Sequence, residues 1–417
     1  MLLLALLAMV LVSGVLYQWL GEWRDARRYP PPGRFVAGLH VYESVPSRDG
    51  QGVSMAVRAA GGDEDGGRAS FSEPRPQGAV ASRPAFNGAD APGLPLPDGR
   101  GSETERSETE RSETERREAE RSEAERQRET ERQAGSDMKS GPTVILEAGI
   151  SASSLSWRLV QDRLDSTARV VSYDRAGYGW SPARSTPRTL DNLVAELHGW
   201  LAASGLPGPY VLVGHSFGGL MLRHYTARHR GQVAGLVLVD PLEPMEWFPA
   251  RPNHTYRLGK GVMLSRRGAT LARMGVVRLA LDLLMSGSHA IPKLLAKVSS
   301  GKGSSVTDRL VGEVRKMPAE VWPMVRAHWC LPRSFRTMAE YLERLPEACA
   351  TPLDDGALRD LPLVVISASK SDPAVVEAHQ RTAALSTKGV HIMAEESGHW
   401  VQLDRPDIVI EAIRRVS

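Results

Sequence analysis

Tyr210-Val-Leu-Val-Gly-His-Ser216-Phe-Gly-Gly219 is the stretch that decides the fold of this chain. An apolar run ends in Gly-X-Ser-X-Gly, and a helix-like segment, residues 220–230, follows at once. This order predicts a strand, a sharp turn and a helix. Gly214 and Gly218 carry no Cβ, so the turn can hold Ser216 in a strained conformation with its Oγ exposed. The pattern predicts a nucleophilic serine, and an ordinary glycine-rich turn is the alternative.

A serine hydroxyl needs a base to accept its proton. In the strand–turn–helix arrangement that base comes late in the chain, where His391 and His399 lie. His391 falls within an alternating, strand-like run, which packing explains. His399 falls in a loop between that run and the terminal helix-like segment, where a side chain can reach Ser216. We therefore expect His399 to be the base.

The base in turn needs a carboxylate to orient it, and two aspartates are candidates. Asp240 ends the apolar run 234–240, and Asp372 follows the later run 361–368. Both stand at the carboxyl end of a predicted strand, where α/β sheets build their sites. The alternative for Asp240 is a cap for the next segment, and the alternative for Asp372 is an Asp-Pro turn. We favour Asp240 as the acid and keep Asp372 as the alternative.

Two backbone N–H groups are candidates for an oxyanion hole. The Phe217 N–H stands at the predicted helix N-terminus, where the helix dipole also favours negative charge. The short apolar strand 143–147 runs into Ala148-Gly149-Ile150, and Gly149 permits a tight turn that would aim the Ile150 N–H at the same place. A plain strand-to-loop turn is the competing interpretation.

Together these residues resemble the α/β-hydrolase superfamily, and most of all bacterial serine hydrolases of the esterase and lipase type. The motifs that carry the resemblance are residues 146–149, 173–179, 214–219, 235–240 and 397–400. The resemblance implies an α/β fold with a mostly parallel central sheet, flanking helices and a helical cap. In the register usual for the superfamily, the acid position after the late strand holds Ser371 rather than Asp372. Some members carry the acid one strand earlier, which fits Asp240.

Other polar residues of these motifs have a structural interpretation. Asp174 and Arg175 could form an acid/base pair, but in such families this segment is a turn after a strand with its charges paired. We expect Glu147 to be hydrogen-bonded beside the oxyanion hole. We expect His215 to pack beneath the turn, since its side chain points away from that of Ser216.

Net charge and motif spacing argue against a nucleic-acid-binding protein and against a metal or cofactor site. The net charge of +3 over 417 residues does not point to nucleic acid. Zinc-ligand spacing and phosphate-binding glycine loops are not seen in the sequence, so we expect no metal and no cofactor. Cys330 and Cys349 are the two cysteines, and whether they pair cannot be read from the sequence. The oligomeric state is equally open.

Residues 1–20 are nearly all apolar and long enough to span a bilayer. They lack a preceding basic residue and a small-residue cleavage site, which argues against a removable signal peptide. Trp23 and Arg24 resemble an interfacial flank. The sequence therefore predicts an N-terminal transmembrane anchor and a membrane-anchored protein, with the side of the membrane uncertain; a buried helix is the alternative.

The rest of the chain divides by composition. Residues 21–45 hold a proline-rich linker and a first strand, residues 34–43. Residues 46–139 form a low-complexity insertion whose Ser-Glu-Thr-Glu-Arg repeats offer no apolar face, so we expect it to be largely disordered. Residues 140–240 and 361–417 would form the two parts of the hydrolase core.

Residues 241–360 would form the helical cap over the site, with helices at 271–285 and 321–329. Such a cap excludes water and shapes a substrate pocket. The candidate pocket walls are apolar: Trp247, Phe248, Met285, Trp322 and Met324.

The sequence therefore predicts a serine hydrolase that cleaves a small-molecule carboxylic ester through an acyl-Ser216 intermediate. Two alternatives remain. The same residues could cleave an amide, as in related iminopeptidases, which an acidic cap residue gripping a free amine would favour. The fold could also be a non-catalytic binding module with a vestigial turn.

Overall fold

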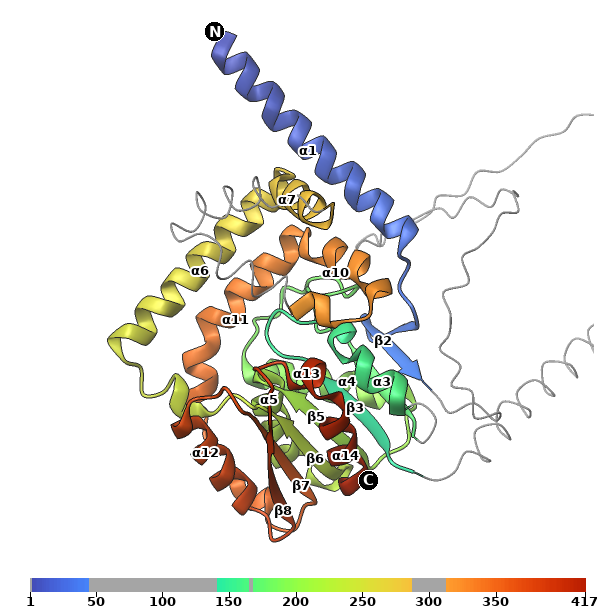
Figure 1. Cartoon of the computed structure of the whole chain (residues 1–417), viewed down its shortest axis with the longest axis vertical. Coiled ribbons are helices and arrows are strands. Elements are labelled where there is room, and N and C mark those ends of the chain that lie inside the picture. Colours follow the sequence, from blue (N-terminus) through green and yellow to red (C-terminus); the bar gives the residue numbers. More distant parts are fainter. Residues whose placement is uncertain (1, 45–140, 165–167, 287–312) are drawn as a thin grey trace, which may run out of the picture. The chain divides into compact units, whose positions relative to one another are not determined.

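A single mixed sheet organises the protein, in a computed structural model that describes residues 2–44, 141–164, 168–286 and 313–417. Its eight strands follow the order β1-β2-β4-β3-β5-β6-β7-β8 (Figure 1). From β4 to β8 neighbouring strands pair in parallel, whereas β1–β2 and β2–β4 pair antiparallel. The strands are β1 (Arg34–Val36), β2 (Leu39–Ser44), β3 (Thr143–Glu147), β4 (Val170–Tyr173), β5 (Tyr210–His215), β6 (Val233–Val239), β7 (Leu363–Ala368) and β8 (Gly389–Ala394).

Helices cover both faces of the sheet. Since side chains alternate along each strand, successive residues pack in opposite cores. In β3, Val144 and Leu146 pack in one core with α3 (Arg158–Leu164) and α14 (Pro406–Val416). Ile145 between them packs in the opposite core with α4 (Leu190–Ser204), α5 (Phe217–Arg228) and α12 (Pro373–Ala384). The predicted α/β fold, with a mostly parallel central sheet and flanking helices, is confirmed.

The segment between β6 and β7 is helical in its described parts. Figure 1 shows its long helices grouped on one side of the sheet. They are α6 (Pro252–Arg273), α7 (Val276–Met285), α10 (Trp322–Trp329) and α11 (Pro332–Ala350), and we call these four helices the cap. Short 3-10 turns occur at η1 (Ser154–Trp157), η2 (Arg230–Gln232), η3 (Pro244–Glu246), η4 (Ala319–Val321) and η5 (Asp355–Leu358), and α13 (Val401–Asp404) precedes α14.

Two predicted elements are broken in the structure. The strand expected at 34–43 is a hairpin, since Ala37 and Gly38 turn the chain with φ of 49° and 77°. The helix expected at 271–285 ends with α6 and restarts with α7, because Gly275 intervenes with φ of 75°. In both places the break lies at a glycine that adopts the left-handed conformation at little cost.

The predicted transmembrane anchor, residues 1–20, is not supported. These residues belong to α1 (Leu2–Arg28), and within the described part of the chain no helix combines the length and apolarity needed to cross a bilayer. The second half of α1 contacts the cap. Gln18 is buried and donates to the Cys330 carbonyl at 2.8 Å. The buried Asp25 carboxylate pairs with Arg278 of α7, which is itself fully buried.

One prediction and one open question remain, on the insertion and on the two cysteines. The low-complexity insertion, residues 46–139, lies outside the described residues. Cys330 and Cys349 are both buried and both free, which answers the question of their pairing.

Candidate active site

Ser216 stands at the turn between β5 and α5 with φ of 54° and ψ of −123°. The turn is tight enough to require its glycines. A Cβ on Gly214 would lie 2.8 Å from the Gly218 carbonyl carbon, and one on Gly218 would lie 2.7 Å from the Ala148 oxygen. Both distances are shorter than any side chain tolerates, so the Gly-X-Ser-X-Gly spacing follows from packing as well as from the turn.

His399 lies in the loop between β8 and α13, beside Ser216. Its Nε2 is 3.0 Å from Ser216 Oγ, and its Nδ1 is 2.7 Å from Asp240 Oδ2. The imidazole side chain is 53% exposed whereas that of Asp240 is 5% exposed, so the pair joins an accessible group to a buried carboxylate. His391 is elsewhere, within β8, where its Nε2 meets Ser367 Oγ at 2.8 Å.

Asp240 follows β6 and takes a strained φ of 40°. Its second oxygen accepts hydrogen bonds from the Ala368 N–H at 3.0 Å and from Ser371 Oγ at 2.9 Å. Burial raises the pKa of Asp240, but the hydrogen bond from His399 and those from Ala368 and Ser371 outweigh it, so the pKa lies below its usual value. The carboxylate is therefore ionised and aimed at His399.

Asp372 is engaged differently. Its Oδ1 accepts from the Ala374 N–H at 2.9 Å and so caps α12. The residue before it, Ser371, is the one that reaches Asp240. The structure thus brings Ser216, His399 and Asp240 together and leaves Asp372 at a helix N-terminus. The part played by Ser371 was missed in the sequence, although the superfamily's usual register points to this position.

The loop after β3 borders the nucleophile. A Cβ on Gly149 would lie 2.9 Å from His215 Nδ1 and 3.3 Å from Ser216 Cβ, so only glycine lets this loop come so close. Ile150 follows in the turn, and Phe217 begins α5. Within the described residues, neither of their backbone N–H groups donates to another backbone group. Both proposed oxyanion donors thus keep their hydrogen-bonding capacity for a ligand.

His215 supports the loop that carries His399. Its Nε2 is 2.8 Å from the His399 carbonyl oxygen. Burial, and secondly the nearby His399, lowers the pKa of His215 to about 3, so the ring is neutral and its N–H donates to that carbonyl. This matches the packing role expected for it beneath the turn.

Asp174 and Arg175, adjacent in sequence, have separate partners. The Asp174 carboxylate meets His40 Nδ1 at 2.9 Å, and the Arg175 guanidinium meets Glu147 at 2.6 Å. All four side chains are buried. They form two pairs that fix the turn after β4 rather than one acid/base pair.

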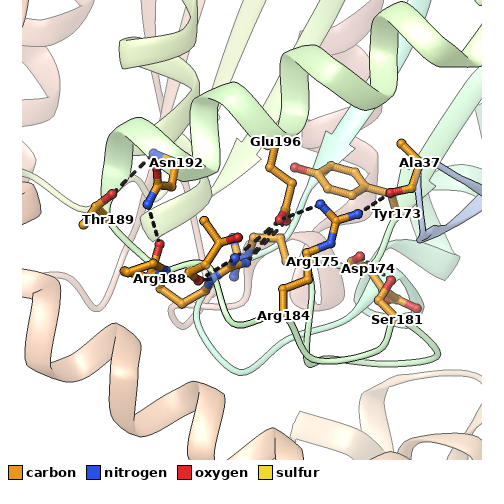
Figure 2. Close-up of polar contacts among 12 residues, drawn as sticks. Ala37, Tyr173, Asp174, Arg175, Ser181, Arg184, Arg188, Thr189, Asn192 and Glu196 are labelled. Atoms are coloured by element: carbon orange, nitrogen blue, oxygen red, sulfur yellow. Dashed lines mark hydrogen bonds and ion pairs between the residues drawn. The ribbon is translucent and has the colours of Figure 1, made fainter. Parts of the chain in front are cut away.

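The chain beyond this turn is tied to the N-terminal hairpin and to α4 (Figure 2). Arg184 donates to the Ala37 carbonyl and meets Glu196 of α4 at 3.3 Å. Arg188 approaches the same carboxylate at 3.4 Å. One buried carboxylate thereby holds two arginines of the loop, and the hairpin turn is secured through the first of them.

The predicted pocket walls are divided among different environments. Trp247 lines a cavity of about 310 Å³ between α6 and α11, together with His254, Leu258, Val262, Leu342 and Pro346 among others. Trp322 and Met324 pack in a separate apolar cluster around Val321 and Val325. Phe248 and Met285 are each 49% exposed, so neither forms a buried wall.

Comparisons with known proteins bear on the family of the chain. The sequence pattern described as "Alpha/beta hydrolase family" matches residues 144–412. An uncharacterised protein of Bacillus subtilis, YqjL, is 35% identical over 112 residues, 27% of this chain and 43% of that protein. Lipase LipV of Mycobacterium tuberculosis is 38% identical over 103 residues, 24% of this chain and 38% of the lipase. The mouse (lyso)-N-acylphosphatidylethanolamine lipase is 34% identical over 101 residues, 23% of this chain and 28% of that protein.

The matched stretches thus span less than half of each relative's own length. Among solved structures, a thermophilic esterase from Thermogutta terrifontis is similar with a TM-score of 0.45 and 22% identity, over 66% of this chain and 88% of the esterase. The match to the family pattern covers more than half of the 417 residues. The chain therefore belongs to the α/β hydrolase family.

Proposed function

We propose that this protein is a serine hydrolase that cleaves a carboxylic ester with a small to medium, apolar acyl group. One observation supports the proposal above the others. A continuous hydrogen-bonded chain runs from Ser216 Oγ to His399 Nε2 at 3.0 Å and from His399 Nδ1 to Asp240 at 2.7 Å. A serine, an imidazole and a buried carboxylate in this order form the arrangement that activates a hydroxyl for acyl transfer.

In the acylation step, His399 Nε2 accepts the Ser216 proton while Oγ attacks the ester carbonyl carbon. The carbonyl oxygen becomes an oxyanion, and the N–H groups of Ile150 and Phe217 stabilise it. The carbon–oxygen bond to the alcohol then breaks, and His399 returns its proton to the leaving oxygen. Asp240 stays ionised throughout and stabilises the imidazolium, which its depressed pKa favours.

Deacylation reverses these roles. Water takes the place of the alcohol, His399 accepts a water proton, and the hydroxide oxygen attacks the acyl carbon. The bond to Ser216 Oγ breaks as His399 gives the proton back to the serine. The products are a carboxylic acid and an alcohol, and the enzyme regains its starting state without any cofactor.

Ester cleavage ranks before amide cleavage for two reasons. Two of the relatives carry the name of lipases. The acidic residues that follow Asp240 are also already engaged: Glu243 meets Arg223 at 3.1 Å, and Glu246 accepts from the Glu243 N–H at 2.9 Å. Burial further raises the pKa of Glu246, which makes it a weaker anchor for a cationic amine.

The proposal is tested by labelling with a fluorophosphonate probe and by turnover of p-nitrophenyl esters of increasing acyl length. We expect labelling of the wild type and its loss in Ser216→Ala, with ester turnover falling on the order of 10⁶-fold. Turnover of amino-acid p-nitroanilides, measured in parallel, tests for amide cleavage. Undiminished labelling of Ser216→Ala would show that the nucleophile lies elsewhere.

A further inference from the structure

The side chain of Arg175 is buried beneath the loop that follows β3. Its guanidinium carbon lies 5.0 Å from the ring centre of Tyr341, 5.6 Å from that of Phe217 and 5.9 Å from that of Tyr178. Only 3% of the side chain is exposed. A guanidinium keeps its charge in such a place, and its two Nη groups donate to protein acceptors.

Those donors bond to more than the paired carboxylate. Arg175 Nη1 donates to Glu147 at 2.6 Å and to the Ala148 carbonyl at 2.8 Å, and Nη2 donates to the Gly149 carbonyl at 2.6 Å. A buried ion pair by itself adds little net stability. The two carbonyl bonds are additional to the pair, and both fall on the loop beside Ser216.

The bond to the Gly149 carbonyl has a consequence at the next nitrogen. The carbonyl of Gly149 and the N–H of Ile150 belong to one planar peptide unit, and this bond is not among the cis peptides of the described chain. In a planar trans unit the C=O and the N–H point in opposite directions. A guanidinium that holds the carbonyl therefore directs the Ile150 N–H away from Arg175.

We propose that Arg175 is the positioning residue of the oxyanion hole, which orients the Ile150 N–H through the Gly149 carbonyl. This inference rests on the proposed function, since it assigns the N–H to the substrate carbonyl oxygen. A charged donor on the carbonyl also polarises the amide and strengthens its N–H as a donor. The second N–H, that of Phe217, takes its direction from the start of α5 and does not depend on this contact.

The test compares Arg175→Lys with Arg223→Lys. Arg223 is a matched control because it is also buried and paired with a glutamate, Glu243, and its hydrogen bonds go to Glu243 and Asp355 rather than to the loop after β3. Lysine keeps the charge but cannot bond both carbonyls and the carboxylate in the planar fork geometry of arginine. Steady-state kinetics on a p-nitrophenyl ester would be measured with the inhibition constant of a trifluoromethyl ketone, whose adduct with Ser216 carries an oxyanion.

For Arg175→Lys we expect kcat to fall about 10²-fold with little change in KM, because an oxyanion donor acts mainly in the transition state. The inhibition constant of the ketone should rise by about the same factor. Arg223→Lys should leave both within about threefold. A loss in Arg175→Lys that lies in KM alone, or an unchanged affinity for the ketone, would overturn the proposal.

A second measurement separates positioning from a general effect on packing. Ile150→Pro has no N–H at the proposed donor, so adding Arg175→Lys to it should cost nothing further in kcat. If the double variant instead loses kcat by the product of the two single losses, Arg175 does not act through the Ile150 N–H. Failure of the proposed function has a different signature, since the wild type itself would then turn over no ester and its probe labelling would not depend on Ser216.

Discussion

The carboxyl edge of the sheet and the contact between α1 and the cap are both built on buried charge, but they are organised differently. At the sheet edge, Asp240 follows β6 and receives its bonds from Ala368 of β7 and from the His399 loop, so the register of the strands sets the geometry. At the other contact, Arg278 of α7 is buried against Asp25 and Gln18 of α1.

The two regions differ in which interactions fix the positions of their charged groups. Parallel strands bring their carboxyl ends to one edge whatever the details of their side chains. The backbone pairing of the strands therefore positions the residues of a site at that edge. Two helices can slide or rotate against one another unless specific groups hold them. The polar contacts of Gln18, Asp25 and Arg278 supply that hold, and the close approach of Gly14 to Gly275 allows it.

The largest effect is expected from a substitution that disrupts the hydrogen bonds at the sheet edge. Asp240→Asn should lower kcat on the order of 10⁴-fold, because an amide can favour the wrong imidazole tautomer of His399. Asp372→Asn is the matched control; its role as a cap of α12 is one that asparagine can fill, so activity should stay near wild type. Steady-state ester kinetics measure both, and a reversed ranking would reassign the acid.

The next largest effect is expected from a substitution that disrupts the contact between α1 and the cap. Arg278→Met leaves the Asp25 carboxylate buried with less compensation, and we expect a loss of about 3–5 kcal/mol in the free energy of unfolding. Arg266→Met removes an exposed ion pair with Glu343 and should cost less than about 1 kcal/mol. Urea unfolding compares the two.

A partner substitution sharpens this second prediction. Asp25→Leu combined with Arg278→Met removes both charges and should recover much of the lost stability, since no buried charge is left unpaired. If the double variant is no more stable than Arg278→Met, the ion pair is not what holds α1 to the cap.

The third effect is a dependence of stability on pH. Burial lowers the pKa of His215 to about 3 and those of His224 and His328 to about 4, against 6.5 for the unfolded chain. Above pH 6.5 these rings are neutral in both states; below it the unfolded chain binds protons that the folded chain does not. Stability should therefore fall from pH 6.5 toward 4, by up to about 1.4 kcal/mol per pH unit for each ring. Urea unfolding of His224→Gln should show a shallower slope than the wild type.

The smallest effect concerns residues 46–139. Ser44 at the end of β2 and Val144 at the start of β3 both pair with Val170 of β4, from opposite sides. Two strand spacings, about 10 Å, therefore separate the ends to be joined, which about four to six residues can span. Replacing the insertion with such a linker should leave ester turnover within about twofold. Loss of soluble, active protein would show that the segment is integral.

Several features could be predicted from the sequence because they depend on local chemistry. The glycines around Ser216 follow from the tightness of its turn, and the continuous apolar runs of β3 and β5 follow from a sheet covered on both faces. The placement of His399 in a loop after the penultimate run also followed from order along the chain. These patterns are short, and neighbouring residues decide them.

Only the tertiary structure decided the rest. Asp240 and Asp372 each follow a strand, and their local sequences do not show that one faces His399 while the other caps α12. The reach of Arg175 to the Gly149 carbonyl depends on how β3 lies beside β4. The same holds for α1, because its sequence alone does not show that Gln18 and Asp25 meet Arg278 of α7. A side chain's direction and its partners come from segments distant in sequence, and packing alone brings those segments together.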